Sequence, residues 1–398
     1  MSKIDELIKK YCPNGVEWDT LENIFYIKNG YTPSKAKQEY WINGTIPWFR
    51  MEDIRKNGRI LSDSIQHITP EAVKDSGLFS ANSIIMATTA TIGEHALLIA
   101  DSLANQRFTF LTPKVNRPND INMKFFYYYG FVLGEWCKNN TNISGFASVD
   151  MAKFKKVKIP IPPQEVQNEI VRILDKFTEL ETELETELEA RKKQYEYYRN
   201  QLLYLSQSVS YKFLSQIVDF MNGKAHEKNI DTEGDFVIVN SKFVSADGRI
   251  RKHSNTQICP VFKNDILMVM SDLPNGKALA KCFYVDEDKR YTLNQRICSL
   301  TVKNKNEMNS RFLFYILSRN KQLLRYDNGV DQTNLRKDDI LKIIVPVPVP
   351  AEQKRIVAIL DKFDKLVCDI SEGLPAEINA RHKQYEYYRD RLLTFKEV

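Results

Sequence analysis

The sequence lacks the patterns that usually mark a metal site, a disulfide framework or a membrane span. Its six cysteines form no C-x-x-C pair, and its five histidines show no ligand or triad spacing. No apolar run approaches the length that crosses a bilayer, and the charged start "MSKIDELIKKYC" does not resemble a signal peptide. We therefore expect a cytoplasmic protein with no bound metal, no disulfide framework and no membrane association.

The motifs of several enzyme classes are missing as well. There is no glycine-rich cofactor loop with the Asn-Pro-Pro-aromatic motif of a methyltransferase, and no G-x-x-x-x-G-K-[ST] phosphate loop. Asp272, Glu287 and Lys289 fit the D…E-x-K pattern of metal-dependent nucleases only loosely, and such spacing arises easily by chance. We therefore expect a non-catalytic chain that holds no cofactor of its own.

The sequence does contain a long internal repeat. The block "IPIPPQEVQNEIVRILDKF" (159–177) returns as "VPVPVPAEQKRIVAILDKF" (345–363), 186 residues later. The block "RKKQYEYYRNQLL" (191–203) returns as "RHKQYEYYRDRLL" (381–393), 190 residues later. The second copy therefore carries four more residues between its two blocks.

Each copy of the repeat predicts a long helix after a proline-rich extended stretch. In the first copy no glycine or proline occurs for some forty residues, which predicts one helix from about Gln164 to Leu205, roughly 60 Å long. In the second copy Gly373 can end one helix and Pro375 can start another. Such narrow helices do not bury themselves alone, so we expect them to pack together. The apolar seam of the first copy, with spacings of three, four or seven, is Ile170, Leu174, Phe177, Leu180, Leu184, Leu188, Tyr195, Tyr198, Leu202 and Leu205.

The segments before the two helices predict related globular domains. Short β-rich runs alternate with turn residues in both, and "NG" and "NQR" recur at Asn29-Gly30 and Asn222-Gly223 and at 105–107 and 294–296. We predict an α+β fold in which two related mixed α/β domains are separated by two long helices, packed as an antiparallel coiled coil with pseudo-two-fold symmetry. The predicted division is a first domain at 1–158, a first spacer helix at 159–207, a second domain at 208–344 and a second spacer helix at 345–398.

Two similar heads held by paired helices suit a ligand that has two-fold symmetry, and duplex DNA has it. The net charge of +6 is compatible with nucleic acid but is also common in proteins that never bind it. The alternative is a coiled-coil scaffold that joins two protein-binding heads and has no affinity for DNA. DNA binding by the heads with a strong salt dependence would separate the two hypotheses.

The stretch "TELETELETELE" (178–189) repeats four residues three times inside the first predicted helix. One interpretation is a solvated helical run that expanded without consequence. The other is a ruler. Four added residues rotate the rest of the helix by about 40° and advance it about 6 Å, whereas one base pair turns the duplex by roughly 35°. On this hypothesis each copy of the four residues changes the gap between two half-sites by about one base pair.

The duplicated blocks "AEQKRIVAILDKF" and "KQYEYYR", with "GVEWDTLENI" near the start and "NQR" in each domain, resemble the specificity subunits of type I restriction-modification enzymes. The resemblance covers nearly the whole chain. It implies two target recognition domains, each reading one half of a split double-stranded DNA site. It also implies two modification subunits, which use S-adenosylmethionine to methylate adenine, and two restriction subunits, which use ATP and Mg to translocate and cleave DNA. The repeat is not strict at two places. The first copy has "QEVQ" where the second has Ala351-Glu352-Gln353, and the second domain lacks the "IPWFR" of residues 46–50.

Candidate DNA contacts are basic, amide and hydroxyl side chains in the loops of the two domains, because Arg and Lys hold phosphates or guanine and Asn or Gln can bind adenine. In the first domain they are Lys35, Lys37, Arg50, Thr88, Thr89, Thr91, Gln106 and Arg107. In the second they are Asn240, Lys242, Arg249, Arg251, Lys252, Ser271, Asn275, Lys277, Gln295 and Arg296. Each of them could instead be a solvated surface residue, and "NQR" could be a structural turn that pins a strand.

The motif "KQYEYYR" places two tyrosines of each copy on the predicted seam and one beside it. An aromatic residue beside the seam, duplicated in both helices, suits docking of two identical partner subunits. Simple helix packing is the alternative. The predicted partner-binding residues are Tyr197, Arg199, Tyr387 and Arg389.

Overall fold

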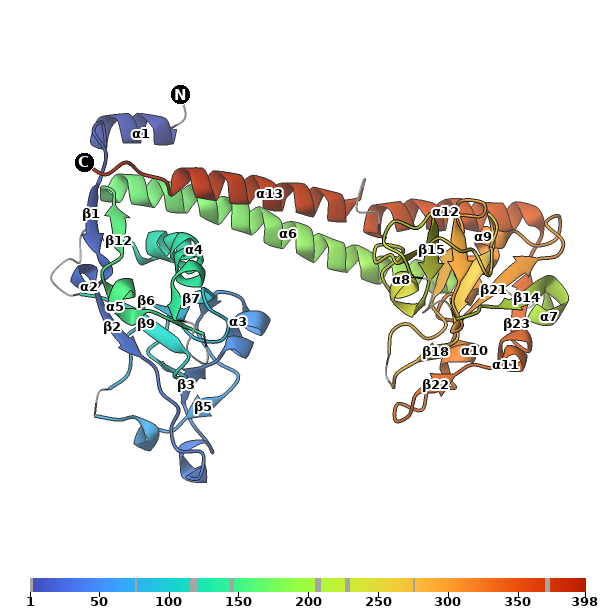
Figure 1. The fold of residues 1–398 in the computed structure, drawn as a ribbon, viewed down its shortest axis with the longest axis horizontal. Coiled ribbons are helices and arrows are strands. Elements are labelled where there is room, and N and C mark those ends of the chain that lie inside the picture. Colours follow the sequence, from blue (N-terminus) through green and yellow to red (C-terminus); the bar gives the residue numbers. More distant parts are fainter. Residues whose placement is uncertain are drawn as a thin grey trace. The chain divides into compact units, whose positions relative to one another are not determined.

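The computed structural model divides the chain into two compact units (Figure 1). Unit 1 comprises Met1–Thr186 and Glu377–Val398, and unit 2 comprises Glu187–Ala376. The residues described are 3–75, 77–114, 121–142, 147–204, 209–225, 230–274, 276–368 and 373–398. No helix in these ranges is long and apolar enough to cross a membrane.

The head of unit 1 is a mixed structure of short strands and helices. Its strands are β1 (Glu17–Thr20), β2 (Phe25–Asn29), β3 (Ile46–Phe49), β4 (Ile60–Leu61), β5 (His67–Ile68), β6 (Ser83–Ala87), β7 (His95–Leu98), β8 (Leu103–Ala104), β9 (Phe108–Pro113), β10 (Thr141–Asn142), β11 (Ser148–Val149) and β12 (Lys158–Ile161). Its helices are α1 (Lys3–Tyr11), α2 (Leu21–Ile24), η1 (Gln38–Tyr40), α3 (Met51–Asn57), η2 (Pro70–Ala72), α4 (Met123–Asn139) and α5 (Met151–Lys155). The main sheet has the strand order β2-β9-β6-β7-β4, and the smaller sheets are β5-β3-β8, β1-β12 and β10-β11.

The head of unit 2 is likewise a mixed structure of short strands and helices. Its strands are β13 (Ser210–Phe213), β14 (Val218–Asn222), β15 (Phe236–Val239), β16 (His253–Ser254), β17 (Ile266–Val269), β18 (Ser271–Asp272), β19 (Cys282–Tyr284), β20 (Tyr291–Leu293), β21 (Ile297–Val302), β22 (Thr333–Asn334) and β23 (Ile344–Val347). Its helices are α7 (Leu214–Ile217), α8 (Ser241–Ser245), α9 (Ser310–Leu317), α10 (Lys321–Leu324) and α11 (Lys337–Leu341). The main sheet is β14-β21-β17-β19, and the smaller sheets are β16-β15-β20, β13-β23 and β18-β22.

The two heads share a set of equivalent strand pairings. β1 pairs antiparallel with β12 as β13 pairs with β23, and a one-turn helix follows β1 and β13 alike. In the three-stranded sheets, β3 pairs parallel with β8 and β15 pairs parallel with β20. The register sets Trp48 against Leu103 and Ile238 against Thr292, which makes Trp48 and Ile238 equivalent positions. The predicted relationship between the two domains is confirmed.

A buried glutamine ties each head to the start of its spacer helix. Gln167 accepts a hydrogen bond from the backbone N–H of Asn122 at 2.9 Å and donates to the carbonyl of Pro162 at 2.7 Å. Gln353 accepts from the N–H of Asn309 at 2.7 Å and donates to the carbonyl five residues before it. Asn122 and Asn309 in turn cap the N termini of α4 and α9. The two copies therefore differ within "QEVQ", but both keep the glutamine at its end, Gln167 or Gln353, which makes equivalent hydrogen bonds in each unit.

The spacer helices are α6 (Gln164–Leu203), α12 (Pro350–Cys368) and α13 (Leu374–Leu392). The continuous first helix and the divided second helix are therefore confirmed, with Pro375 in the first turn of α13. The four-residue repeat is helical throughout, and its threonines form one line along α6. The Thr182 hydroxyl donates to the carbonyl of Thr178 at 2.9 Å, and the Thr186 hydroxyl donates to that of Thr182 at 2.8 Å. Both interpretations of this repeat predict a helix, so its helicity does not separate them.

Each unit contains its own pair of packed spacer helices. In unit 1, the ring of Phe177 on α6 lies 5.5 Å from that of Tyr388 on α13, and Glu181 lies 3.2 Å from His382. From the first contact to the second, the residue number increases along α6 and decreases along α13, so these two segments run antiparallel. In unit 2, the Tyr198 ring of α6 stacks at 5.8 Å on a phenylalanine of α12. A coiled coil along the full length, and a two-fold axis between the halves, stay predictions.

Candidate nucleic-acid interface

The tripeptide "NQR" forms the same turn in both units, between β8 and β9 in unit 1 and between β20 and β21 in unit 2. The Asn105 side chain accepts a hydrogen bond from the backbone N–H of Arg107 at 3.0 Å, and the Asn294 side chain accepts one from Gln295 at 2.6 Å. The glutamine and the arginine that follow the asparagine are exposed in both turns. The asparagine therefore shapes the turn, whereas the two longer side chains reach solvent where a ligand could meet them.

A glycine at the end of a strand crosses this turn in each unit. The N–H of Gly30 donates to the carbonyl of Phe108 at 2.9 Å, and that of Gly223 donates to Ile297 at 3.0 Å. A Cβ atom on Gly30 would lie 2.2 Å from the carbonyl oxygen of Ala104, and one on Gly223 would clash with the same turn in unit 2. The recurring "NG" is thus a requirement of close backbone approach. In both heads the backbone of this glycine therefore packs directly against the "NQR" turn.

Most of the predicted DNA contacts of unit 1 lie at the surface. Lys35, Lys37, Gln106 and Arg107 are exposed, and Arg50, Thr89 and Thr91 are half-buried. The Lys37 ammonium donates to the Tyr40 hydroxyl at 3.0 Å and lies over its ring. The Gln106 carbonyl accepts a hydrogen bond from the Thr32 hydroxyl, which leaves its amide N–H groups directed to solvent. These side chains supply donors for phosphate oxygens and base edges.

In unit 2, three of the predicted basic contacts lie on one loop, between α8 and β16. Arg249, Arg251 and Lys252 are exposed there, and the turn that presents them uses the positive φ angles of Asp247 and Gly248. The other exposed predicted contacts of this unit are Lys242, Lys277, Gln295 and Arg296. Asn240 is half-buried and caps α8 by accepting from the N–H of Phe243 at 2.9 Å. Asn275 lies outside the described residues.

Two predicted contacts are corrected because their side chains are buried. Thr88 is 4% exposed, and its hydroxyl bonds that of Thr109 at 2.9 Å. Ser271 is 6% exposed, and its hydroxyl accepts from the Gln332 amide at 2.8 Å. A hydroxyl residue next to a turn is expected from sequence to be exposed. Here both residues follow strands of the main sheets, and their hydroxyls form hydrogen bonds within the head. They do not belong to the interface.

Two of the three D…E-x-K residues, Asp272 and Glu287, make contacts with residues near them in the sequence. The Asp272 carboxylate accepts hydrogen bonds from three backbone N–H groups of its own loop, those of Leu273, Ala278 and Leu279, at 2.7 to 3.1 Å. Glu287 is paired with Arg290 three residues on. Within the described ranges no group of three or more His, Cys, Asp or Glu side chains is placed to hold a metal ion. Asp272 therefore orders the loop that carries Lys277.

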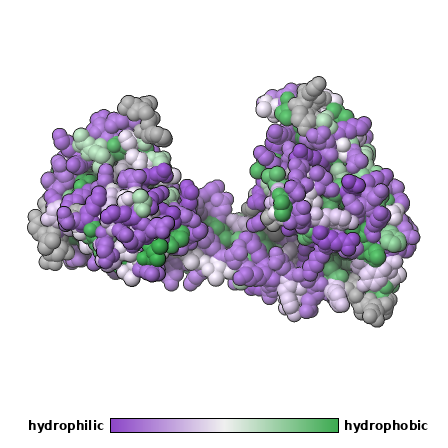
Figure 2. All heavy atoms as spheres, turned by 90° about the horizontal axis from the view of Figure 1, so that it is seen from below, coloured by the Kyte–Doolittle hydropathy of each residue, from purple (hydrophilic) through white to green (hydrophobic). Residues whose placement is uncertain are grey.

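The face shown in Figure 2 is mainly hydrophilic in each unit, and hydrophobic residues occupy only small separate areas of it. A protein–protein interface usually has an apolar core, whereas protein–DNA interfaces are more polar and more positively charged. Large apolar areas of the kind that form the core of a stable protein interface are therefore not seen on this face.

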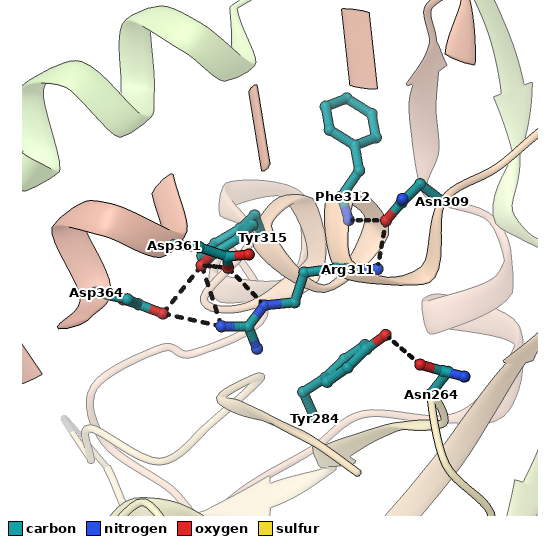
Figure 3. A network of polar contacts seen from close by, with 8 residues as sticks. All are labelled: Asn264, Tyr284, Asn309, Arg311, Phe312, Tyr315, Asp361 and Asp364. Carbon is teal, nitrogen blue, oxygen red and sulfur yellow. Dashed lines mark hydrogen bonds and ion pairs between the residues drawn. The ribbon is translucent and has the colours of Figure 1, made fainter. Parts of the chain in front are cut away.

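A carboxylate network anchors the head of unit 2 to α12 (Figure 3). The Tyr315 hydroxyl donates to Asp361 at 2.6 Å, and Arg311 donates to the same carboxylate at 2.8 Å. Asp364 accepts from the Tyr315 hydroxyl at 3.1 Å, and burial raises the pKa of its carboxyl against the opposing pull of Arg311. These bonds fix the orientation of α9 on the spacer helix.

Unit 1 builds a simpler version of the same anchor. The Tyr128 hydroxyl donates to Asp175 at 2.7 Å, and Lys124 donates to its second oxygen at 2.7 Å. Asp175 and Asp361 are the aspartates of the duplicated "LDKF". Sequence reasoning did not assign these residues a role, although their identity in both copies was a signal that could have found them.

The predicted partner-binding residues separate into two kinds. Tyr197 and Tyr387 are 59% and 61% exposed, so the aromatic residue beside the seam is equally available on both helices. Arg199 donates to the backbone carbonyl of Tyr315 at 2.7 Å, and Arg389 lies 4.7 Å from the ring of a phenylalanine on α4. Both arginines therefore hold the helix against its own head, and their role in a partner surface stays a prediction. The tyrosines keep that prediction.

Comparison with known proteins places the chain among DNA-recognition proteins. Residues 13–191 and 207–380 each match the family described as the type I restriction modification DNA specificity domain. The specificity subunit of the type I restriction enzyme EcoprrI from Escherichia coli is 40% identical over 393 residues, which span 94% of this chain and 93% of that protein. The specificity subunit of EcoR124I/EcoR124II from Escherichia coli is 34% identical over 64% of this chain and 69% of that protein.

Solved structures share the fold. The S subunit of a type I restriction-modification system from M. genitalium is 18% identical, has a TM-score of 0.51, and is matched over 96% of this chain and 97% of that one. A chain from a structural study of complex assembly and conformational transition of the type I R-M system is 15% identical, has a TM-score of 0.64, and is matched over 96% of this chain and 98% of that one.

Proposed function

Because this chain belongs to the family of type I restriction-modification DNA specificity domains, we propose that it is the subunit that chooses the DNA sequence on which a type I complex acts. Its two heads read the two halves of a split site. One observation carries the proposal. Equivalent "NQR" turns lie on a common scaffold in both units, and the exposed residues around those turns differ. A shared scaffold with different contact residues is what reading two different half-sites requires.

The duplicated helices support docking of two copies of one partner. Tyr197 and Tyr387 lie in identical sequence contexts and are exposed to nearly the same extent. Exposed aromatic side chains of this kind anchor protein interfaces. We infer that the partner is a modification subunit which carries S-adenosylmethionine and methylates adenine, and that two restriction subunits add the ATP-dependent translocation and cleavage. Those cofactors and reactions then belong to the partners, and this chain contributes recognition.

The proposal is tested by mapping methylated adenines across the genome of a strain that carries this chain and its modification subunit. The expected result is a single bipartite motif with a fixed gap. A band-shift assay with the same complex should show affinity for that duplex which falls steeply as salt rises. Absence of any motif, together with absence of DNA binding by the complex, would favour the protein scaffold instead.

Docking is tested separately by Tyr197→Ala and Tyr387→Ala. Each change should weaken assembly with the modification subunit, and the double variant should assemble least. The stability of the chain should change by less than about 0.5 kcal/mol, because both side chains are exposed. Glu196→Ala, a change at the exposed neighbour of Tyr197, is the control and should assemble normally. Normal assembly of the double variant would contradict this part of the proposal.

A further inference from the structure

Unit 1 has a groove whose floor is aromatic and whose rim is polar. It has a volume of about 530 Å³ and is lined by Lys35, Gln38, Trp41, Ile42, Trp48, Arg50 and Gln66. None of these seven side chains is acidic. The groove lies between the loop that follows β2 and the end of β3, on the same head as the "NQR" turn.

The floor is rigid because both indole N–H groups are already bonded within the head. The Trp48 indole donates to the carbonyl of Tyr31 at 3.0 Å, and the Trp41 indole donates to that of Ser34 at 3.1 Å. The two rings meet edge to face, with centroids 4.9 Å apart. Neither tryptophan can rotate without breaking a hydrogen bond and this contact, so the groove keeps its shape without a ligand.

The rim carries donors that the protein does not use. The Lys35 ammonium and the side-chain amides of Gln38 and Gln66 make no hydrogen bond or ion pair within the described part of the chain. Arg50 is held more firmly. Its backbone N–H donates to the buried carboxylate of Asp53 at 2.6 Å, and its guanidinium carbon lies 5.8 Å from the centre of the Trp48 ring.

The Nε atom of Arg50 is buried and has no hydrogen-bond partner among the residues described, so the two Nη groups are the part of the guanidinium that a ligand can reach. Among the residues that the structure describes, its one ion pair is with Glu52, at 3.4 Å, and Glu52 also pairs with Lys56 at 2.9 Å. A planar guanidinium that is oriented by a ring presents two parallel donors. The acceptors O6 and N7 on the major-groove edge of guanine match that geometry, and side-chain amides read neighbouring bases in the same way.

Resting on the proposed function, the geometry points to Arg50 as a specificity-determining residue that reads a guanine in the half-site bound by unit 1, with Lys35 holding a neighbouring phosphate. Unit 2 does not repeat this arrangement. The strand register places Ile238 where unit 1 has Trp48, and Asn240 follows β15 where Arg50 follows β3. Substitution of Arg50 should therefore change one half-site and leave the other intact.

The test uses the full chain assembled with its modification subunit. Duplexes are compared in a band-shift assay in which each base pair of the first half-site is replaced in turn. For Arg50→Ala and Arg50→Lys, discrimination at one G·C pair should fall by about tenfold to a hundredfold. Requirements at every other position, including the whole second half-site, should remain. The control is Arg55→Ala, which removes an exposed arginine of α3 that does not line the groove.

Salt dependence separates base reading from phosphate contact. Arg50→Ala should leave the slope of log affinity against log salt nearly unchanged, whereas Lys35→Ala should lower it by about one and weaken all sequences equally. Unchanged discrimination in Arg50→Ala overturns the assignment, as does a lowered slope with unchanged discrimination. If the wild-type complex shows no bipartite preference at all, the proposed function fails and this inference fails with it. Altered discrimination in the second half-site would contradict the inference alone.

Discussion

The two heads of this protein share a scaffold and differ in what they present on it. Both contain the "NQR" turn under a strand-end glycine, and both use a buried glutamine and an aspartate of "LDKF" to hold the spacer helix. Around that frame, unit 1 carries a tryptophan-lined groove with Arg50, whereas unit 2 carries a basic loop at 249–252. Residues that set the geometry are thus duplicated, whereas the groove and the basic loop differ between the units.

The largest expected effect comes from changing the length of the helix that the two units share. Deletion of Thr182 to Glu185 should leave both half-sites unchanged and shorten the gap between them by about one base pair, so methylation of the original sites should disappear. Mapping of methylated adenines measures both results. The matched control is Thr182→Ala with Thr186→Ala, which keeps the length and removes the hydroxyl bonds along α6. An altered half-site in the deletion variant would contradict the ruler.

Next in size is the loss of the buried glutamine from either unit. Gln167→Ala and Gln353→Ala should each lower the free energy of unfolding of their unit by about 2 to 4 kcal/mol, because each leaves a buried N–H and carbonyl without partners. In unit 2, Gln353 also donates to the carbonyl of Glu307 at 2.8 Å, so its loss removes the partner of that acceptor as well. Urea unfolding with hydrogen exchange resolved by unit measures both. Lys354→Ala, at an exposed neighbour, should cost less than about 0.5 kcal/mol.

A fall in pH should change the stability of the two main sheets differently. His95 on β7 is buried, and burial lowers its pKa from 6.5 to about 4, with nearby Arg59 adding to the effect and Glu94 opposing it. The strand register puts Cys282 at the equivalent place in unit 2, where burial raises the thiol pKa well above its ordinary value. The fold therefore holds His95 neutral, while the unfolded chain protonates it near pH 6.5.

The resulting stability is fully present above about pH 6.5 and is lost progressively as the pH falls to about 4, where the loss reaches up to about 3 kcal/mol. Hydrogen exchange corrected for intrinsic rates should show unit 1 opening over this range. His95→Gln keeps a donor for the carbonyl of Tyr127, which His95 contacts at 3.0 Å, and should remove this part of the acid sensitivity. Equal acid sensitivity in the variant and the natural chain would contradict this explanation.

The smallest expected effect distinguishes the structural role of Asn105 in the "NQR" turn from the DNA-binding role proposed for Arg107. Asn105→Ala should destabilise unit 1 by about 1 kcal/mol, because its side chain closes the turn, and Asn294→Ala should do the same in unit 2. Arg107→Ala should leave stability within about 0.5 kcal/mol and lower the salt slope of DNA binding by about one. Thermal unfolding and salt titrations of binding measure the two kinds of change. A stable Asn105→Ala variant with lost DNA binding would reverse the assignment.

The architecture was predictable from the sequence because repeats and breakers act locally. The duplicated blocks predicted two related heads, and the absence of glycine and proline in 164–203 predicted the unbroken helix. The candidate interface was predictable only in part. Exposed lysines and arginines were placed correctly at the surface, but Thr88 and Ser271 were not, since burial depends on which strand a residue follows.

The sequence by itself determined that this protein is a duplicated pair of heads with long helices, because those features follow from periodicity, identity and the backbone preferences of glycine and proline. Only the tertiary structure decided which side chains work inside the heads and which face outward. The sequence predicts the same role for Arg199 and Tyr197, yet Arg199 forms a hydrogen bond to its own head whereas Tyr197 is exposed. Lys35 and Gln66 line one groove although they are distant in the sequence, and such proximity has no signature in local sequence.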